Sequence, residues 1–200
     1  MALESVIKFN QERKRHILVV EDTRIQALKL VHDLNEGGFQ TSWAQNGKEA
    51  LKLLEQENSN FDLVATDIQM PEMDGFGLIE ALRKNPRFEH LPVIALSTQT
   101  GDEFRLTPIK LGASDFLNKG YLPEELELRI VNNIRLNEMR MALKGENQEL
   151  YSQLQAAYAE IKTKLANLEE SHQKLKEAQE DVIRMERITS TTAFSNGLAH

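Results

Sequence analysis

Short apolar segments recur through the first 120 residues of the chain. They are rich in β-branched residues, and turn-forming or charged residues bound each of them. A short apolar run of this kind predicts a β-strand that is buried on both faces. Five strands are therefore expected, at residues 16–20, 39–43, 61–66, 92–97 and 114–118.

The segments between these strands carry apolar residues three and four positions apart, which predicts amphipathic helices. Turn signals mark the helix ends, with Gly37-Gly38 after the first helix and Pro86 after the third. Buried strands that alternate with helices indicate a parallel sheet covered on both faces. We therefore predict an α/β domain with a flavodoxin-like, doubly wound sheet of five parallel strands in the order 2-1-3-4-5. Ligands in such sheets bind beyond the carboxyl ends of the central strands.

The chain beyond Pro123 has a different pattern, helical and without proline to about residue 188. One apolar row repeats at every seventh position, and a weaker row lies four positions before it. A sustained seven-residue repeat predicts a coiled coil with a second helix of similar length, so we expect a parallel homodimer through residues 136–188. The alternative is a single solvated helix. The first row, called the leucine row, contains Leu154, Ile161, Leu168, Leu175 and Val182, and the second row contains Leu150, Ala157, Lys164, Ser171, Ala178 and Met185.

Composition narrows the setting in which the protein works. The formal net charge is −7, so no overall basic field favours nucleic acid as a partner. Cysteine is absent, which removes disulfides and thiolate metal sites and favours a reducing compartment. No apolar run approaches the roughly 18 residues that a membrane span needs. A cytoplasmic protein without a membrane anchor is expected.

Three acidic residues follow two of the predicted strands. Glu21 and Asp22 come directly after the first strand, and Asp67 comes after the third. These two strands are neighbours in a flavodoxin-like sheet, so the three carboxylates converge and would repel one another. A hard divalent cation with oxygen ligands resolves the repulsion. The sequence therefore predicts a Mg²⁺ site at this edge of the sheet.

A hydroxyl group and an ammonium group are expected at the same edge. The fourth strand ends in Ser97, and Lys119 follows the fifth strand. Asp67 could act there as a nucleophile towards phosphorus, because the metal and Lys119 offset the charge of the incoming phosphoryl group. The expected product is an acyl phosphate.

Residues 16–135 resemble the receiver domain of two-component response regulators. The resemblance covers about 120 residues and rests on four motifs that occur in the family's order: VVED, DIQMPEMDG, PVIALST and GASDFLNKG. It implies that Asp67 is the phosphorylated residue. It also implies that Asp22, Asp67 and the backbone carbonyl of Gln69 ligate Mg²⁺, that Glu21 acts through water, and that Lys119 contacts the phosphoryl group.

The resemblance implies a conformational switch as well. Ser97 would move its hydroxyl towards the phosphoryl group, and Phe116 would turn inward with it; the alternative for Phe116 is an ordinary core aromatic. Two positions depart from the family pattern. Gly120 stands where proline usually follows the lysine, so a trans peptide bond and a looser loop are expected there. Thr98 stands in place of alanine and narrows access to the site.

The last residues, 189–200, resemble the start of a histidine kinase dimerisation helix, with His200 at the phosphoacceptor position. The chain has no nucleotide-binding lobe and no Gly-rich phosphate loop, so it is not a kinase by itself. We expect an N-terminal extension (1–15), a receiver (16–135), a coiled-coil helix (136–188) and the beginning of a dimerisation helix (189–200). This order suggests the N-terminal part of a hybrid-type sensor histidine kinase.

The functional hypothesis is phosphorelay signalling, in which Asp67 takes a phosphoryl group from a cognate histidine kinase or a phosphotransfer protein. The alternatives are a stand-alone response regulator and a receiver joined to a cyclase or phosphatase output. A phosphohydrolase with Asp67 as nucleophile would need an acid two residues later, where Gln69 stands. A purely structural dimeriser would not need the intact set of Asp22, Asp67 and Lys119.

Overall fold

The computed structural model describes residues 13–56, 59–99 and 101–197. All five predicted strands are present, and the largest offset is in the third strand, which was expected from residue 61 and begins at Leu63. The helix expected to end near residue 188 continues to Gly197. In chain order the elements are β1 (His16–Val20), α2 (Arg24–Glu36), β2 (Gln40–Ala44), α3 (Gly47–Glu55), β3 (Leu63–Asp67), α4 (Gly75–Lys84), β4 (Val93–Ser97), α5 (Asp102–Lys110), β5 (Asp115–Asn118) and α6 (Pro123–Gly197).

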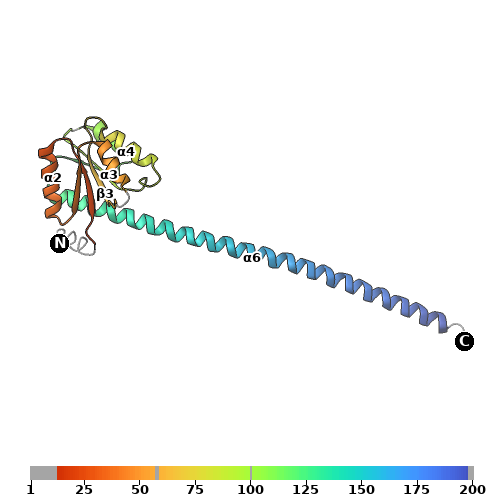
Figure 1. Ribbon diagram of the computed structural model, residues 1–200. Helices are drawn as coiled ribbons and strands as arrows, with labels where there is room; N and C mark the ends of the chain where they lie inside the picture. The colour runs from red at the N-terminus through yellow and green to blue at the C-terminus, as the bar shows by residue number, and fades with distance from the viewer. Residues whose placement is uncertain (1–12, 57–58, 100, 198–200) are drawn as a thin grey trace. The chain divides into compact units, whose positions relative to one another are not determined.

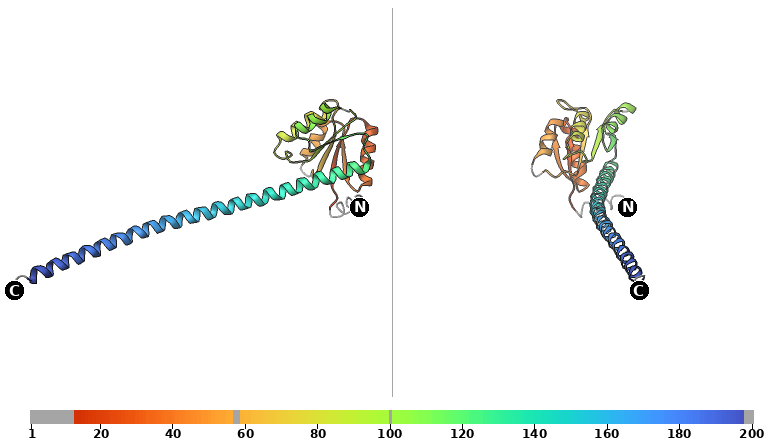
Figure 2. Two further views of the ribbon diagram at one scale, coloured as in Figure 1. Left: turned by 180° about the vertical axis from the view of Figure 1, so that it is seen from behind. Right: turned by 90° about the vertical axis from the view of Figure 1, so that its right-hand side faces the viewer.

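The five strands form one parallel sheet in the order β2-β1-β3-β4-β5, which confirms the predicted flavodoxin-like topology. Helices cover both faces of the sheet (Figure 1; Figure 2). The register aligns the carboxyl ends of the central strands, because Val20 pairs with Thr66 and Asp67 pairs with Leu96. The residues that follow β1 and β3 therefore lie beside one another.

Each strand contributes alternate side chains to two separate cores. Ile17 and Val19 of β1 pack under α2 and the beginning of α6, whereas Leu18 and Val20 pack under α3 and α4. This two-sided burial explains why the strands read as continuous apolar runs. Each fully buried leucine or isoleucine contributes about 2 kcal/mol to the free energy of unfolding, so the sheet edge that carries the acidic residues rests on a rigid base.

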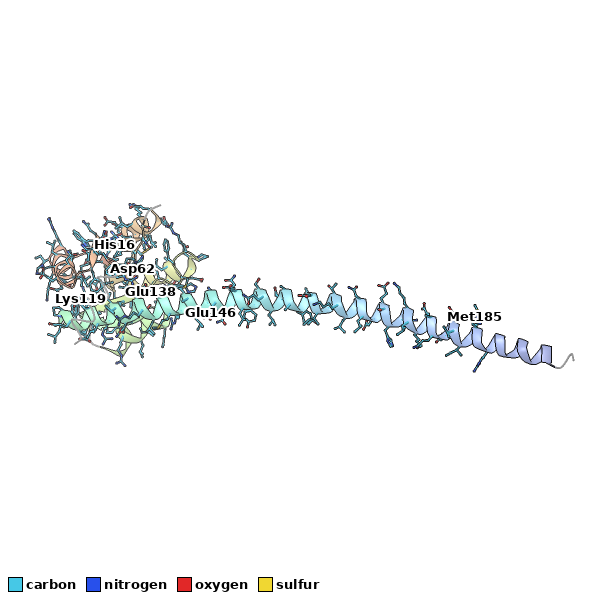
Figure 3. All side chains as sticks on the ribbon, turned by 90° about the horizontal axis from the view of Figure 1, so that it is seen from below. His16, Asp62, Lys119, Glu138, Glu146 and Met185 are labelled. Carbon is cyan, nitrogen blue, oxygen red and sulfur yellow. The ribbon has the colours of Figure 1, made fainter. Side chains whose placement is uncertain are left out.

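The beginning of α6 belongs to the sheet domain. Leu126, Ile130 and Ile134 are buried in the core on that side. At the opposite edge of the sheet from the acidic residues, Arg15 forms ion pairs with both Asp62 and Glu138 of α6. The side chains of Asp62 and Glu138 are labelled in Figure 3. A second compact unit begins at Leu143, and its described side chains are solvent-exposed through Met185.

None of the helices described here combines the length and apolar character needed to cross a lipid bilayer.

Candidate functional site

Three carboxylates meet at the carboxyl edge of the sheet, as predicted. Glu21 follows β1 and is 1% exposed, and Asp67 is the last residue of β3 and is 8% exposed. Asp22 is exposed at the rim. Each of the three offers an oxygen atom that lies within 4.8 Å of those of the other two. The parallel pairing of β1 with β3 brings these residues together although more than forty positions separate them in the chain.

Lys119 links two of these acids. Its Nζ donates hydrogen bonds to Oε2 of Glu21 and Oδ2 of Asp67, both at 2.7 Å. A third bond goes to Oε1 of Gln26, on the first turn of α2, at 2.8 Å. The three donors of the ammonium group are thereby satisfied. The Lys119 side chain is only 12% exposed, so its charge is poorly screened and offsets the charge of the two buried carboxylates.

Burial and neighbouring charges shift the pKa values of two groups at the site. Burial raises the pKa of Glu21, and the nearby charge of Asp67 adds to this effect, whereas the hydrogen bond and charge of Lys119 act in the opposite direction. Burial also raises the pKa of Tyr121 to about 12, with further contributions from Asp33 and Glu21. For both groups burial is the main cause of the raised pKa, and neighbouring negative charge adds to it.

Backbone contacts hold the acidic residues in place. The indole Nε1–H of Trp43 donates to the carbonyl oxygen of Glu21 at 2.8 Å, and the Thr66 hydroxyl donates to the carbonyl oxygen of Asp67 at 2.8 Å. A Cβ atom placed on Gly75 would lie 2.3 Å from the carbonyl oxygen of Asp67. Only glycine permits the first turn of α4 to approach the β3 backbone this closely.

The donor set at this edge fits Mg²⁺. All three candidate ligands are carboxylates, and hard divalent cations prefer oxygen. Opposite oxygens around an octahedral Mg²⁺ lie about 4 Å apart, so groups within 4.8 Å of one another need only a small adjustment to share an ion. Asp22 is the exposed member of the set and leaves a side open to water ligands.

Among the described residues, Ser97 and Phe116 form no hydrogen bond with the three carboxylates. Ser97 ends β4 and is buried, and its Oγ accepts a hydrogen bond from the backbone N–H of Gln99 at 3.0 Å. The backbone N–H of Lys119 donates to the carbonyl oxygen of Ser97 at 2.8 Å, which joins the ends of β4 and β5. Phe116 is half-buried against the core under α3 and α4. An open groove of about 450 Å³ adjoins it, lined on the other side by Arg105, Glu125 and Arg129.

Gln69, Thr98 and Gly120, which were also predicted to belong to the site or to border it, each have contacts of their own. The Gln69 N–H lies 3.4 Å from Oδ1 of Asp67, and its side-chain oxygen accepts a hydrogen bond from Gln99. Thr98 is exposed and borders a pocket of about 260 Å³ beside Lys119. The Lys119–Gly120 peptide bond is trans, as expected. His200 lies outside the described residues.

Two contributors were not predicted from the sequence. Gln26 could have been found, because it lies on the first turn of the helix that follows β1, at the same edge as Asp22. Trp43 carried no such signal. Its indole reaches Glu21 only because β2 pairs with β1, so that Trp43 lies opposite Val19.

Comparison with known proteins agrees with this geometry. Residues 17–131 match the model of the response regulator receiver domain family. A probable transcriptional regulator, ycf27 of Cyanidium caldarium, is 34% identical over 131 residues, which are 66% of this chain and 51% of that protein. An uncharacterized 14.6 kDa protein of Leptolyngbya boryana is 42% identical over 115 residues, 58% of this chain and 86% of that protein. The chain thus spans about half the length of the ycf27 regulator.

A solved structure has a similar fold. The signal receiver domain of a signal transduction histidine kinase from Syntrophus aciditrophicus superposes with a TM-score of 0.56 at 34% identity. The match covers 60% of this chain and 90% of that one. The family match extends over more than half of the chain and includes the acidic residues and the lysine at the carboxyl edge of the sheet. The chain therefore belongs to the response regulator receiver domain family.

Proposed function

We propose that the protein acts in a phosphorelay, in which Asp67 accepts a phosphoryl group from a phosphohistidine of a kinase or phosphotransfer partner. The observation that supports this most directly is the contact of one ammonium group, Lys119 Nζ, with both Asp67 and Glu21. It sets one positive charge against two buried carboxylates, beside a donor set suited to Mg²⁺. An ionised carboxylate with a cation beside it is what nucleophilic attack on a charged phosphoryl group needs.

The proposed transfer is a direct displacement at phosphorus. A carboxylate oxygen of Asp67 forms the new O–P bond while the P–N bond to the partner's imidazole breaks, and the imidazole leaves with the electron pair. Asp22, Asp67 and the Gln69 carbonyl would hold Mg²⁺, with Glu21 acting through water, and the ion would offset charge on the phosphoryl oxygens. Lys119 would exchange its bond to the Asp67 carboxylate for one to a phosphoryl oxygen.

Ser97 and Phe116 are proposed to change conformation in response to the negative charge of a phosphoryl group on Asp67. Ser97 is buried at the end of β4, one strand away from Asp67, and its hydroxyl would donate to a phosphoryl oxygen. Phe116 borders the open groove of about 450 Å³, so its half-buried ring has space on one side to change rotamer. A dianion at Asp67 would thereby change the surface formed by β5 and its flanking helices.

Phosphorylation is tested by incubating the protein with acetyl phosphate and Mg²⁺ and measuring intact mass. We expect one phosphoryl adduct that is stable in mild acid, is lost in hydroxylamine, and is absent from Asp67→Asn. Asp181→Asn is the matched control, because it makes the same exchange at an exposed position of α6. An unchanged adduct in Asp67→Asn, or no adduct in the native chain, would refute the assignment.

A phosphohydrolase predicts a different result, namely steady release of phosphate from simple esters. The side chain two residues after Asp67 is Gln69, which cannot act as a general acid and is hydrogen-bonded to Gln99. Turnover of phosphate esters without a lasting adduct would favour that activity over the phosphorelay.

The coiled-coil helix is proposed to make the protein a parallel homodimer through residues 136–188. Its leucine row is exposed in the single chain, with Leu154 and Leu168 both more than half accessible. No other helix among the described residues exceeds thirteen residues, so none of them can pair with α6 along its length, which supports a partner helix from a second copy. Sedimentation at micromolar concentration tests this, and a monomer there would contradict the dimer.

The parent protein is proposed to be a hybrid-type histidine kinase, with residues 189–200 beginning its dimerisation helix and His200 as a second phosphoacceptor. Two observations support this: α6 continues without a break to Gly197, and a similar receiver comes from a signal transduction histidine kinase. The names of the ycf27 relatives favour an alternative output in transcription. Phosphopeptide mapping of the full-length protein after incubation with ATP separates these outputs, with His200→Gln as the control.

A further inference from the structure

The exposed surface of α6 carries a third apolar row. This row, in place of the second row, can form a coiled-coil seam together with the leucine row. Tyr151, Tyr158 and Leu165 lie three positions before Leu154, Ile161 and Leu168. We call these three residues the tyrosine row. All three are more than half exposed, with Tyr158 at 71% and Leu165 at 53%. In Figure 3, side chains project from both the upper and the lower side of α6 between Glu146 and Met185.

The second row and the tyrosine row flank the leucine row on opposite sides, because they precede it by four and by three positions. Only one of them can complete a coiled-coil seam at a given level of the helix. Over residues 151–168, the second row supplies Ala157 and Lys164, whereas the tyrosine row supplies two aromatic residues and a leucine. The tyrosine row therefore buries far more apolar surface when a second helix packs against it.

The charge of Lys164 also favours a seam that contains the tyrosine row. In a parallel dimer with the second row in the seam, Lys164 of one chain would face Lys164 of the other in a desolvated position. With the tyrosine row in the seam, Lys164 lies at the flank of the seam. In a parallel dimer, a flanking residue at this position faces the residue of the partner chain that is five positions later in the sequence. That residue is Glu169, so Lys164 of each chain forms an ion pair with Glu169 of the other chain. Within the single chain Lys164 pairs with Glu160, and both side chains are largely exposed and free to rearrange.

We infer that a second copy of this chain docks in parallel along α6, with a seam over residues 151–168 that contains the tyrosine row in place of Ala157 and Lys164. This inference rests on the dimer proposed above and specifies which face forms it. The partner is another copy for two reasons. Two identical helices place the same two apolar rows opposite each other along the whole seam, and the Lys164–Glu169 pairs form only when the two chains are aligned in register.

Single cysteines test the seam directly, because the chain contains no cysteine of its own. Adjacent variants Ala157→Cys and Tyr158→Cys, and likewise Lys164→Cys and Leu165→Cys, are oxidised in the full chain and resolved on a non-reducing gel. We expect the cysteines at 158 and 165 to form dimers at least about tenfold faster than those at 157 and 164, since side chains in the seam face each other and flanking ones do not. Ile161→Cys is the reference, because the leucine row lies in either seam.

The outcomes separate failure of the seam from failure of the dimer. Fast cross-linking at 161 together with equal or faster rates at 157 and 164 would leave the dimer standing and overturn the tyrosine seam. Slow cross-linking at 161, with only monomer in sedimentation, would overturn both.

Charge exchange gives an independent readout. Lys164→Glu should weaken the dimer about tenfold, because it sets two like-charged pairs across the interface, and Lys164→Glu with Glu169→Lys should restore it. Lys174→Glu is the matched control, since Lys174 forms the same kind of intrahelical pair, with Glu170, but faces away from this seam. Failure of the double exchange to restore the dimer would overturn the assignment, because Glu169 lies outside the alternative seam.

Discussion

The ammonium nitrogen of Lys119 lies 2.7 Å from Oδ2 of Asp67. Asp67 ends β3 and Lys119 follows β5, so this bond spans the end of β4, which lies between them in the sheet. The same nitrogen also bonds Glu21 at 2.7 Å, so one cation offsets two buried negative charges. This arrangement makes Lys119 a structural element of the free protein as well as a candidate ligand for a phosphoryl group.

Replacing Lys119 should therefore destabilise the free protein. We expect Lys119→Met to lower the free energy of unfolding by about 3 kcal/mol, because two buried carboxylates lose their counter-charge. Saturating Mg²⁺ should recover part of the loss by neutralising the same acids. Urea denaturation with and without Mg²⁺ measures both effects. Lys29→Met, at an exposed position of α2, should change stability by less than about 0.5 kcal/mol, and an equal loss in the two variants would contradict the interpretation.

Mg²⁺ binding should be visible in the fluorescence of Trp43. This is the only tryptophan of the chain, and its indole donates to the backbone of Glu21. We expect a saturable change in emission on titration with Mg²⁺. Asp22→Asn should weaken the response at least about tenfold, because it removes a charged ligand. Asp181→Asn, far along the sequence on α6, should leave the titration unchanged; a response that survives in Asp22→Asn would place the ion elsewhere.

Gly75 should be sensitive to the smallest substitution. Gly75→Ala places a methyl group against the carbonyl oxygen of Asp67, a backbone atom that cannot move without shifting this proposed phosphoacceptor. We expect a loss of about 2 kcal/mol in the free energy of unfolding and slower reaction with acetyl phosphate.

Gly145→Ala is the matched control for that substitution. A Cβ at Gly145 meets nothing within 4 Å, and the residue lies inside α6. Alanine should therefore stabilise this helix, by up to about 1 kcal/mol, without changing phosphorylation. Equal phosphorylation rates in the two alanine variants would show that the contact at Gly75 does not position Asp67.

Glu127 should make stability depend on pH. Burial raises the pKa of this carboxyl group, and the charges of Glu124 and Asp33 raise it further. The Glu127 carboxyl group thus binds its proton more tightly in the folded state than in the unfolded state. The contribution of this proton to the free energy of unfolding is complete at pH values below the pKa of the unfolded state, and it is lost as the pH rises through the pKa of the folded state.

Glu127→Gln removes this titration. The variant should gain stability relative to the native chain as pH increases from 4 to 8, with the largest difference at the upper end. Thermal unfolding across that range measures it. Glu146→Gln, at an exposed site on α6, should follow the native curve. A constant difference between Glu127→Gln and the native chain would show that Glu127 titrates normally.

Much of this architecture follows from local pattern. The β-branched runs and the helical spacing between them predict five strands, all of which are present. Burial on both faces holds for the central strands β1, β3 and β4, whereas β2 and β5 are only partly buried because they form the edges of the sheet. The convergence of Glu21, Asp22 and Asp67 was predictable once the strand order was assumed, because the carboxyl ends of parallel strands share one edge. The start of the third strand was less predictable, because Asp62 contacts His16, which is distant in sequence: the Asp62 carboxylate accepts a hydrogen bond from the backbone N–H of His16.

By itself, then, the sequence determined which segments are strands and helices, which residues carry the acidic and cationic groups, and where the seven-residue repeat lies, since all of these depend on neighbours along the chain. Only the tertiary structure decided that Lys119 bonds Gln26 as well as the two acids, that Trp43 supports Glu21, and that Gly75 presses against Asp67. Those contacts join residues that are distant in sequence, and their lengths depend on how the helices pack on the sheet. Periodicity and composition carry no record of such distances.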